Sequence, residues 1–413
     1  MTTAADTRLY WAHAGLSVSG GRLAIAGRDA EGVAREHGTP LYVFDLTRIT
    51  EQVAALQQAL AGAGLRYVTR FSMKAQREPE VLAHLRGLGP PVTPQTIGAD
   101  VCSPVELAGA LASNWRGDEI SYTGTNVSDR DFEATCAQPI RLNVDCLSQL
   151  RRFARHAPGR NVGLRVNVRC GAGHSGRYGG DLYSSDKPTK FGFYEEQLPE
   201  AIEIARAGGL TITGLHFHAS SGLLDDDLPD FTETVRRAAT MASFLLEAGC
   251  PIDEINAGGG LEGLDLDAYA AVLAEHLGPL GPVVSVEPGE FLFGDSAVLL
   301  AEVVTVEDRL GAPFVGLDAG WNLAPDRFIY EVPLEVVLCR DALPESVRAT
   351  TITGNINEGD DVFAEDHSFP AAREGDIVAI LYAGGYWQNM VAPHCGRLKP
   401  PAVYFVDRLE AGS

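Results

Sequence analysis

Short apolar runs alternate with amphipathic stretches along the middle of the chain. In the stretches between the runs, apolar residues recur every three or four positions, which predicts helices, as at 49–61, 78–88, 198–207 and 231–248. The apolar runs predict strands at residues 41–44, 65–68, 120–122, 140–144, 162–166, 212–217, 254–256 and 283–286. A repeated strand–helix unit is typical of a parallel sheet that helices cover on both faces.

About eight such units over roughly 250 residues match the size of a (β/α)8 barrel. A doubly wound open sheet is the alternative explanation of the same pattern. We therefore predict a barrel over residues 36–290.

The pattern changes after about residue 295. Strand-like runs follow one another with little helix between them, at 297–305, 314–317, 334–338, 350–353 and 377–382. This predicts a C-terminal all-β domain. Residues 23–26 are strand-like too, so we expect 1–35 and 291–413 to form the second domain together.

Composition narrows the function classes. The chain has 413 residues, 45% of them hydrophobic, which suffices for two domains with large cores. A net charge of −22 argues against nucleic acid and anionic membrane surfaces as partners. No apolar run is long enough to span a bilayer, and no signal peptide is recognisable. Seven scattered cysteines favour reduced thiols over a zinc site, so we expect a cytoplasmic protein without a metal.

The functional side chains of a barrel come from the C-terminal ends of its strands. Lys74 lies there, and an amine removed from water at this position is a nucleophile that can form an imine. A lysine on a surface loop is the alternative. His216 and His218 end another strand and point the same way. One imidazole could stack on a flat ring or relay a proton, unless the two are a hydrogen-bonded core pair.

Two further strand ends carry groups suited to a phosphate and to a ring nitrogen. Ser221 offers a hydroxyl, and Gly258 to Gly260 allow backbone N–H groups to approach an anion. An ordinary tight turn is the alternative, and a nucleotide-binding loop would need a different spacing. Glu287 ends the last strand, where a carboxylate could keep a ring nitrogen protonated or merely cap a helix.

This order of groups resembles the group IV decarboxylases of fold type III, above all diaminopimelate decarboxylase, with ornithine decarboxylase and alanine racemase as more distant relatives. The matching motifs cover nearly the whole chain and lie at 40–45, 73–75, 98–103 with Glu106, 143–145, 190–192, 216–222, 258–260, 287–289, 365–366 and 383–386. The resemblance implies a barrel, a β domain and decarboxylation of an amino acid with pyridoxal 5'-phosphate. Racemisation or epimerisation on the same cofactor is the alternative.

The resemblance also implies roles for single residues. Lys74 corresponds to the Schiff-base lysine, His218 to the ring-stacking histidine and Glu287 to the partner of the pyridine nitrogen. The remaining cofactor contacts are expected from Asp100, Ser221, Gly258, Gly259, Gly260 and Tyr386. The family forms head-to-tail homodimers in which the β domain completes the neighbouring site, so the same is expected here.

Several positions depart from the family pattern. The motif that carries the family's catalytic cysteine begins here with Asn357 and Glu358, and an amide cannot donate a proton to the α-carbon. Water or Tyr386 is a possible substitute. Glu290 replaces an arginine that holds phosphate or a substrate carboxylate.

The remaining departures concern the substrate. Asp326 replaces the arginine that grips the distal carboxylate of diaminopimelate, although Arg327 and Tyr330 lie beside it, and Gln76 stands where asparagine is usual. A carboxylate at position 326 suits a neutral or cationic side chain. We therefore expect a divergent decarboxylase from a specialised pathway that acts on another amino acid or on a conjugate, free or carrier-bound. The expected substrate-binding residues are Glu290, Asp326, Arg327, Tyr330 and Glu358.

Overall fold

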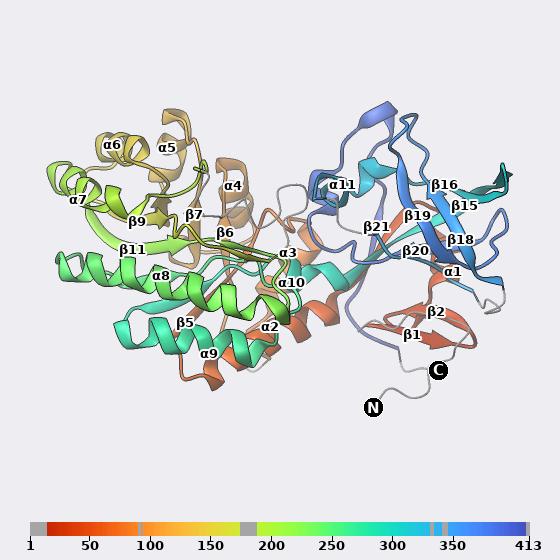
Figure 1. Cartoon of the computed structure of the whole chain (residues 1–413), viewed down its shortest axis with the longest axis horizontal. Helices are drawn as coiled ribbons and strands as arrows, with labels where there is room; N and C mark the ends of the chain where they lie inside the picture. The colour runs from red at the N-terminus through yellow and green to blue at the C-terminus, as the bar shows by residue number, and fades with distance from the viewer. Residues whose placement is uncertain are drawn as a thin grey trace. The chain divides into compact units, whose positions relative to one another are not determined.

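The computed structural model describes residues 15–89, 92–93, 95–173, 188–330, 334–340 and 346–409, with residues 326 and 327 described by their backbone alone. The chain divides into two compact units (Figure 1). Gln52–Phe291 forms one, here called the barrel unit. Met1–Glu51 and Leu292–Ser413 form the other, here called the β unit.

Eight parallel strands close into a barrel in the order β11-β13-β14-β5-β6-β7-β8-β9. They are β5 (Tyr67–Ser72), β6 (Gly98–Val101), β7 (Ile120–Thr123), β8 (Arg141–Val144), β9 (Asn161–Val166), β11 (Thr211–Phe217), β13 (Glu254–Asn256) and β14 (Val283–Val286). Pairing of β14 with β5 closes the cylinder, which confirms the predicted barrel and excludes the open sheet.

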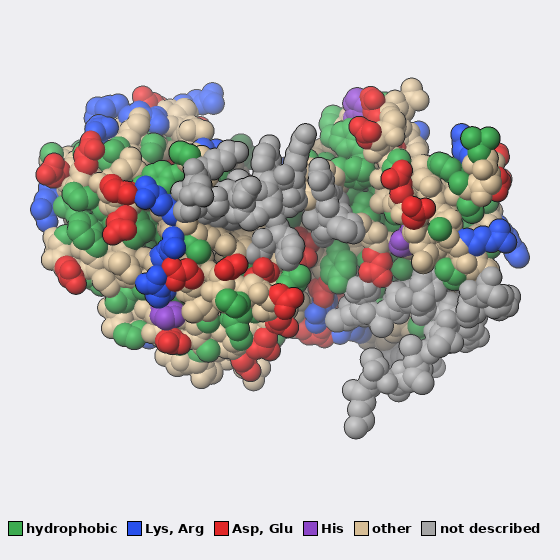
Figure 2. All heavy atoms as spheres, viewed as in Figure 1, with side chains coloured by type: hydrophobic (Ala, Val, Ile, Leu, Met, Phe, Trp, Pro, Cys, Tyr) green, Lys and Arg blue, Asp and Glu red, His purple; other side chains and the backbone are tan. Residues whose placement is uncertain are grey.

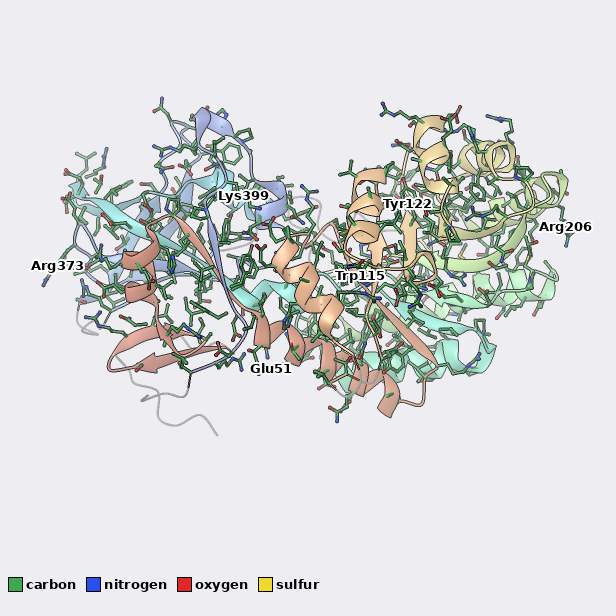
Figure 3. The ribbon with its side chains drawn as sticks, turned by 180° about the vertical axis from the view of Figure 1, so that it is seen from behind. Glu51, Trp115, Tyr122, Arg206, Arg373 and Lys399 are labelled. Carbon is green, nitrogen blue, oxygen red and sulfur yellow. The ribbon has the colours of Figure 1, made fainter. Side chains whose placement is uncertain are left out.

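Helices cover the outside of this cylinder (Figure 1). They are α2 (Leu46–Gly62), α3 (Pro79–Gly87), α4 (Pro104–Ala112), α5 (Asp129–Cys136), α6 (Leu147–His156), α7 (Leu198–Ala207), α8 (Leu228–Glu247) and α9 (Leu266–Leu277). An apolar stripe packed against the strands explains why the periodicity predicted α2, α3, α7 and α8. Trp115, after α4, packs its ring 5.3 Å from that of Phe71 and donates from Nε1 to the Ile97 carbonyl at 2.9 Å (Figure 3).

One predicted barrel strand belongs to the other unit. Residues 41–44 lie in β4 (Leu41–Asp45), which pairs with β15 and β21 of the β unit. The barrel strand missing from the prediction is β6, which has only four residues and includes Gly98 and Asp100. A buried apolar run reads the same in either sheet, so the pattern alone could not assign it. The units accordingly divide at Glu51, not at the predicted residue 36.

The β unit is built on one large sheet. Its strands besides β4 are β15 (Ala297–Arg309), β16 (Ala312–Leu317), β17 (Val336–Leu338), β18 (Arg348–Thr353), β19 (Val362–Phe369), β20 (Ile377–Ile380) and β21 (Ala402–Phe405). A three-stranded sheet of β1 (Leu16–Ser19), β2 (Arg22–Ile25) and β3 (Arg28–Asp29) precedes α1 (Ala30–His37).

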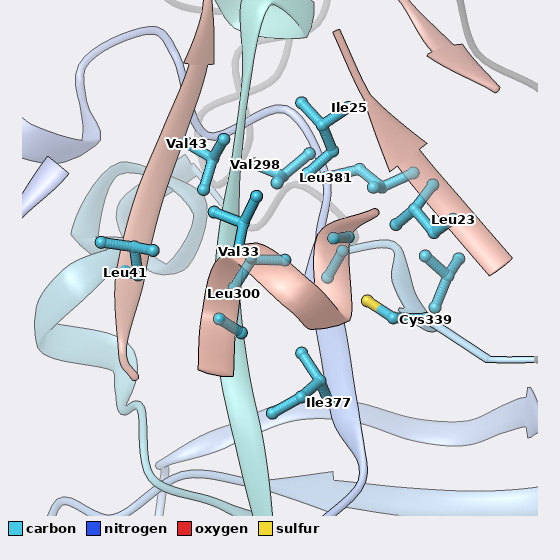
Figure 4. Close-up of a cluster of buried hydrophobic side chains, with 14 residues drawn as sticks. Leu23, Ile25, Val33, Leu41, Val43, Val298, Leu300, Cys339, Ile377 and Leu381 are labelled. Atoms are coloured by element: carbon cyan, nitrogen blue, oxygen red, sulfur yellow. The ribbon is translucent and has the colours of Figure 1, made fainter. Parts of the chain in front are cut away.

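Both ends of the chain build the core of the β unit. Val33 of α1 packs with Leu41 of β4 and Leu300 of β15 (Figure 4). The N–H of Leu23 donates to the Cys339 carbonyl at 2.9 Å, so the predicted N-terminal strand joins the C-terminal domain. The first 14 residues of that predicted domain lie outside the described residues.

The surface carries charge of both signs. Acidic and basic side chains are interspersed over the visible face of each unit (Figure 2). All seven cysteines are free thiols. In the described ranges, no helix combines the length and apolar character needed to cross a membrane.

Candidate active site at the barrel mouth

Barrel closure gathers residues that lie far apart in the sequence. Ser72, the last residue of β5, pairs with Asp100 of β6, and its N–H donates to the Pro288 carbonyl after β14 at 3.0 Å. Lys74 follows within two residues, and its charge influences both Asp100 and His218. The predicted lysine, histidine and acidic residues of the barrel therefore meet at one end of the cylinder.

Lys74 differs from the expectation in one respect. Its side chain is exposed in the single chain, so the predicted removal of this amine from water is wrong for the barrel unit by itself. The lysine comes just after the end of β5, where the backbone leaves the sheet.

The Glu287 carboxylate is buried and held from two sides. Asn256 donates from Nδ2 to Oε1 at 2.6 Å, and His216 Nε2 lies 3.3 Å from Oε2. Burial alone would raise the pKa of Glu287, but His216, His218 and Asn256 outweigh it and hold this pKa well below its usual range. Glu287 is therefore an anion at the bottom of the mouth.

Asp100 is the protonated partner of that anion. It is buried, accepts a hydrogen bond from the Ser121 hydroxyl at 2.8 Å and is also hydrogen-bonded with Glu287. Burial and the negative charge of Glu287 raise the pKa of Asp100 well above its usual range. The two carboxyl groups thus hold one proton between them.

His218 is a neutral imidazole in one tautomer. Its Nδ1 accepts the Gly259 N–H at 3.0 Å, so its proton is on Nε2. Burial, followed by the charges of Lys74 and Arg165, holds the pKa of His218 well below its usual range. The ring therefore offers an uncharged flat face.

The three glycines after β13 are required by close packing. A Cβ at Gly259 would lie 2.3 Å from the Glu287 carbonyl oxygen, and one at Gly260 would lie 2.2 Å from that of Ser220. Two of their N–H groups serve the site itself, since Gly258 donates to Asn256 Oδ1 at 2.8 Å and Gly259 donates to His218. The loop thus orients Asn256 and His218. The Gly260 N–H donates to neither of these side chains. Ser221 lies in β12 (Ser220–Ser221), which pairs with β10 (Ala172–Gly173).

Sequence reasoning missed Arg165. It lies in β9 opposite His216, is 7% exposed and stacks 4.2 Å from the centre of the Phe191 ring. Among the described residues no carboxylate pairs with it, which is rare for a buried guanidinium and points to an anionic ligand. A charged residue inside the apolar run 162–166 was the available signal.

Cys102 was also missed as a candidate. Its N–H and its thiol both donate to Oε2 of Glu106, at 2.8 and 3.2 Å. Glu106 is buried in the first turn of α4, where its N–H is capped by the Ser103 hydroxyl. Partial desolvation of the sulfur and the Glu106 carboxylate raise the pKa of the Cys102 thiol to about 12, although the residue is exposed.

The remaining predicted residues are spread over both units. In the β unit, Glu358 Oε1 lies 2.9 Å from His394 Nε2, and Asn357 precedes it in the same loop. Tyr386 has φ of +63° and precedes α12 (Trp387–Met390). In the barrel unit, Glu290 begins the short helix α10 (Glu290–Phe293), three residues after Glu287.

Three substrate-binding predictions fall on α11 (Pro325–Tyr330) of the β unit. Tyr330 ends this helix with 46% of its surface exposed. The side chains of Asp326 and Arg327 lie outside the described part of the chain, so their roles stay predictions.

Comparison with known proteins identifies the family. The model of the pyridoxal-dependent decarboxylase pyridoxal-binding domain matches residues 46–294. The chain is 33% identical over 402 residues to diaminopimelate decarboxylase of Methanothermobacter thermautotrophicus, covering 93% of this chain and 90% of that protein. It is 30% identical to the Streptomyces coelicolor protein of the same name, covering 95% and 89%.

A solved structure has the same fold. Diaminopimelate decarboxylase from M. jannaschii, crystallised with L-lysine, superposes with a TM-score of 0.85 at 25% identity, covering 95% of this chain and 93% of that one.

The residues at the mouth fit the cofactor of this family. The ionised Glu287 suits a protonated ring nitrogen, and the neutral His218 suits a ring face. Arg165, which pairs with no carboxylate of the described residues, suits an anionic oxygen. An exposed lysine stands beside them. The chain belongs to the pyridoxal-dependent decarboxylase family and is a carboxy-lyase that uses pyridoxal 5'-phosphate.

Proposed function

We propose that this enzyme decarboxylates an amino acid other than diaminopimelate, or an amino-acid conjugate. The observation that carries the decarboxylation is the buried Glu287 anion beside the neutral His218, at the end of the barrel that also carries Lys74. These are the charge states that a protonated pyridine ring requires of its neighbours.

Each residue at the mouth has a defined task in this proposal. Bound pyridoxal phosphate supplies the electron sink that allows the bond between the α-carbon and the carboxylate to break. Lys74 provides the amine that holds the cofactor and is exchanged for the substrate amine. Glu287 keeps a proton on the ring nitrogen, and Asp100 stabilises Glu287 through their shared proton. His218 would support the ring face, and the Ser221 hydroxyl and the Gly260 N–H would be available to the phosphate.

The substrate proposal is supported by the sequence departures. At position 290 a carboxylate replaces the arginine with which the family binds an anion. At position 326, on α11, a carboxylate likewise replaces an arginine. Two carboxylates would repel the distal carboxylate of diaminopimelate and attract an amine or a neutral polar group. A substrate without a second carboxylate is therefore favoured.

The alternative of racemisation is weaker. The matching family and the curated relatives described above are all named decarboxylases. In a racemase the Cα–H bond would break and the carboxylate would remain.

The proposal includes a head-to-tail homodimer. Family relationship supports it, and Tyr386, Asn357 and Glu358 of the β unit are then the residues offered to the neighbouring site. The substrate-binding residues of α11 belong to the same unit.

The first test is an absorbance scan with pyridoxal phosphate across a panel of amino acids, with released carbon dioxide assayed in the same samples. Lys74→Ala should lose the absorbance of the covalently bound cofactor and all turnover. Lys399→Ala, which replaces an exposed lysine of the β unit (Figure 3), is the control and should keep both.

The outcomes separate the alternatives. Carbon dioxide from neutral or cationic amino acids, and little from diaminopimelate, is the expected result. Exchange of the α-hydrogen with deuterium without carbon dioxide would establish the racemase instead. Efficient turnover of diaminopimelate would refute the substrate proposal alone.

A further inference from the structure

The thiol of Cys102 and the amine of Lys74 occupy equivalent places on neighbouring strands. Ser72 pairs with Asp100, Lys74 follows Ser72 by two residues, and Cys102 follows Asp100 by two. The charge of Lys74 acts on both the Asp100 carboxyl group and the Cys102 thiol, so the amine lies near both groups. Met73 points the opposite way, since its Cε is the nearest atom to a Cβ built on Gly109 of α4. Adjacent strands lie about 5 Å apart, so thiol and amine are neighbours at the mouth.

Glu106 fixes the thiol in this place. One oxygen, Oε2, accepts both the Cys102 N–H at 2.8 Å and the thiol at 3.2 Å. Glu106 is only 6% exposed, whereas Cys102 is exposed. The charge of Lys74 acts on the thiol, and the carboxylate keeps the proton on sulfur at neutral pH. The result is a protonated, accessible acid beside the cofactor lysine.

Two buried polar groups at the same mouth point independently to a ligand. Arg165 has no carboxylate partner among the described residues, and Nδ1 of His216, a residue 1% exposed, has no hydrogen-bond partner there. The charges of Arg165 and His216 act on His218, and so does the charge of Lys74. Cys102 lies at this mouth as well, since the charges of Lys74 and Asp100 act on its thiol.

We propose that the Cys102 thiol is the acid that returns a proton to the reacting carbon after carbon dioxide leaves, and that Glu106 is its positioning residue. This inference rests on the proposed decarboxylation. The S–H bond breaks and a C–H bond forms with the electron pair that previously bound the carboxylate. The thiolate then takes a proton from water, so no oxidant or reductant is needed.

The inference resolves the problem posed by Asn357. An amide cannot supply the proton, whereas a protonated thiol can act as a general acid. Cys102 belongs to the same unit as Lys74, so this donor does not depend on another part of the molecule.

The first test measures where the thiol lies, without turnover. The purified protein is treated with iodoacetamide with and without pyridoxal phosphate, and the labelled cysteines are mapped by mass spectrometry. Cofactor should slow labelling of Cys102 at least several-fold and leave unchanged that of Cys136, a partly exposed thiol that ends α5 just before the start of β8 in the same unit. Glu106→Gln should speed labelling of Cys102 in the cofactor-free protein, because a neutral neighbour makes the thiolate easier to form.

The second test follows the products. Cys102→Ala should form amine on the order of 100-fold more slowly. It should also divert turnover toward a carbonyl product and aminated cofactor, because the proton then reaches a cofactor carbon instead of the α-carbon. Cys136→Ser should match the wild type, and adding Asn357→Cys to Cys102→Ala should restore amine formation.

Each result has a distinct meaning. Unprotected Cys102, or normal products from Cys102→Ala, would overturn the role of the thiol and leave the decarboxylation standing. Protection of Cys102 in a protein that releases no carbon dioxide from any amino acid would overturn the decarboxylation itself, and with it the proton transfer. A rate loss in Cys102→Ala without altered products would reduce Cys102 to a structural residue.

Discussion

At the scale of single residues, the chemistry depends on how one proton is distributed between two buried acids. Glu287 receives hydrogen bonds from Asn256 and His216, whereas Asp100 receives one from Ser121. The larger set of donors stabilises the charge on Glu287, so the proton remains on Asp100. Because the proton is on Asp100, Glu287 is free to accept a hydrogen bond from the cofactor, and Asp100 stabilises Glu287.

Glu287→Gln should lower kcat on the order of 100-fold or more while the cofactor remains bound, because an amide cannot keep the ring nitrogen protonated. Steady-state kinetics and the absorbance of the bound cofactor give the two measurements. Glu275→Gln on α9 replaces an exposed glutamate of the same unit and should change neither. An unchanged kcat in Glu287→Gln would remove Glu287 from the mechanism.

Asp100→Asn should make stability less dependent on pH. The pKa of Asp100 is raised in the folded state, so its contribution to stability is fully present below the unfolded value near 3.9 and is lost as pH rises toward the folded value. An amide can still donate to Glu287 without ever ionising. The melting temperature of the variant relative to wild type, measured without cofactor, should therefore rise between pH 4 and pH 8, by about 2 °C or more. A constant difference would contradict the raised pKa.

At the scale of elements, the glycine loop after β13 couples two strand ends. It passes so close to the carbonyl groups of Glu287 and Ser220 that no side chain fits, and its N–H groups orient His218 and Asn256. Sequence reasoning attributed these glycines to phosphate binding, with an ordinary tight turn as the alternative. Their packing role depends on chain segments that only the folded barrel brings together.

Gly260→Ala should therefore destabilise the folded protein far more than the positive φ at this position alone would explain. Gly281 is a matched control, since its φ of +95° resembles the +100° of Gly260 but nothing lies within 4 Å of a Cβ there. Gly281→Ala should lower the free energy of unfolding by about 1 kcal/mol. Gly260→Ala should lower it several times more and should also weaken cofactor binding. Urea unfolding and cofactor titration measure the two effects, and equal costs at both positions would contradict the packing argument.

The elements also show what the sequence could reveal. Long periodic helices such as α7 and apolar strands such as β11 were predicted within a few residues, because each buries a regular face. β6 escaped, since four residues with a glycine and an aspartate have no apolar period. Lys74, His218 and Glu287 were recognised from their places after strands, but Arg165 and Cys102 gain meaning only from their contacts.

At the scale of the whole molecule, candidate residues come from two units. Lys74, His218 and Glu287 belong to the barrel unit, whereas Tyr386 and Glu358 belong to the β unit. A head-to-tail dimer would place residues of one chain's β unit at the other chain's mouth. This proposal can be tested without a structure of the dimer.

Chains of Lys74→Ala and Tyr386→Phe, each impaired alone, should recover activity when unfolded together and refolded. Random pairing leaves one intact site in half of the dimers, so the mixture should approach about a quarter of wild-type activity. A mixture of two barrel-unit variants, Lys74→Ala and Glu287→Gln, is the control and should recover nothing. Absence of recovery in the first mixture would place both residues in the site of a single chain.

The pairing of β4 with β15 and β21 has a consequence for folding during synthesis. Residues 41–45 leave the ribosome early, yet their partner strands begin only at Ala297 and Ala402. A strand of five fully buried residues must therefore wait, uncovered, while the entire barrel is synthesised. During that interval it is a natural target for chaperones and a point of risk for aggregation, so this early strand is among the last to find its place.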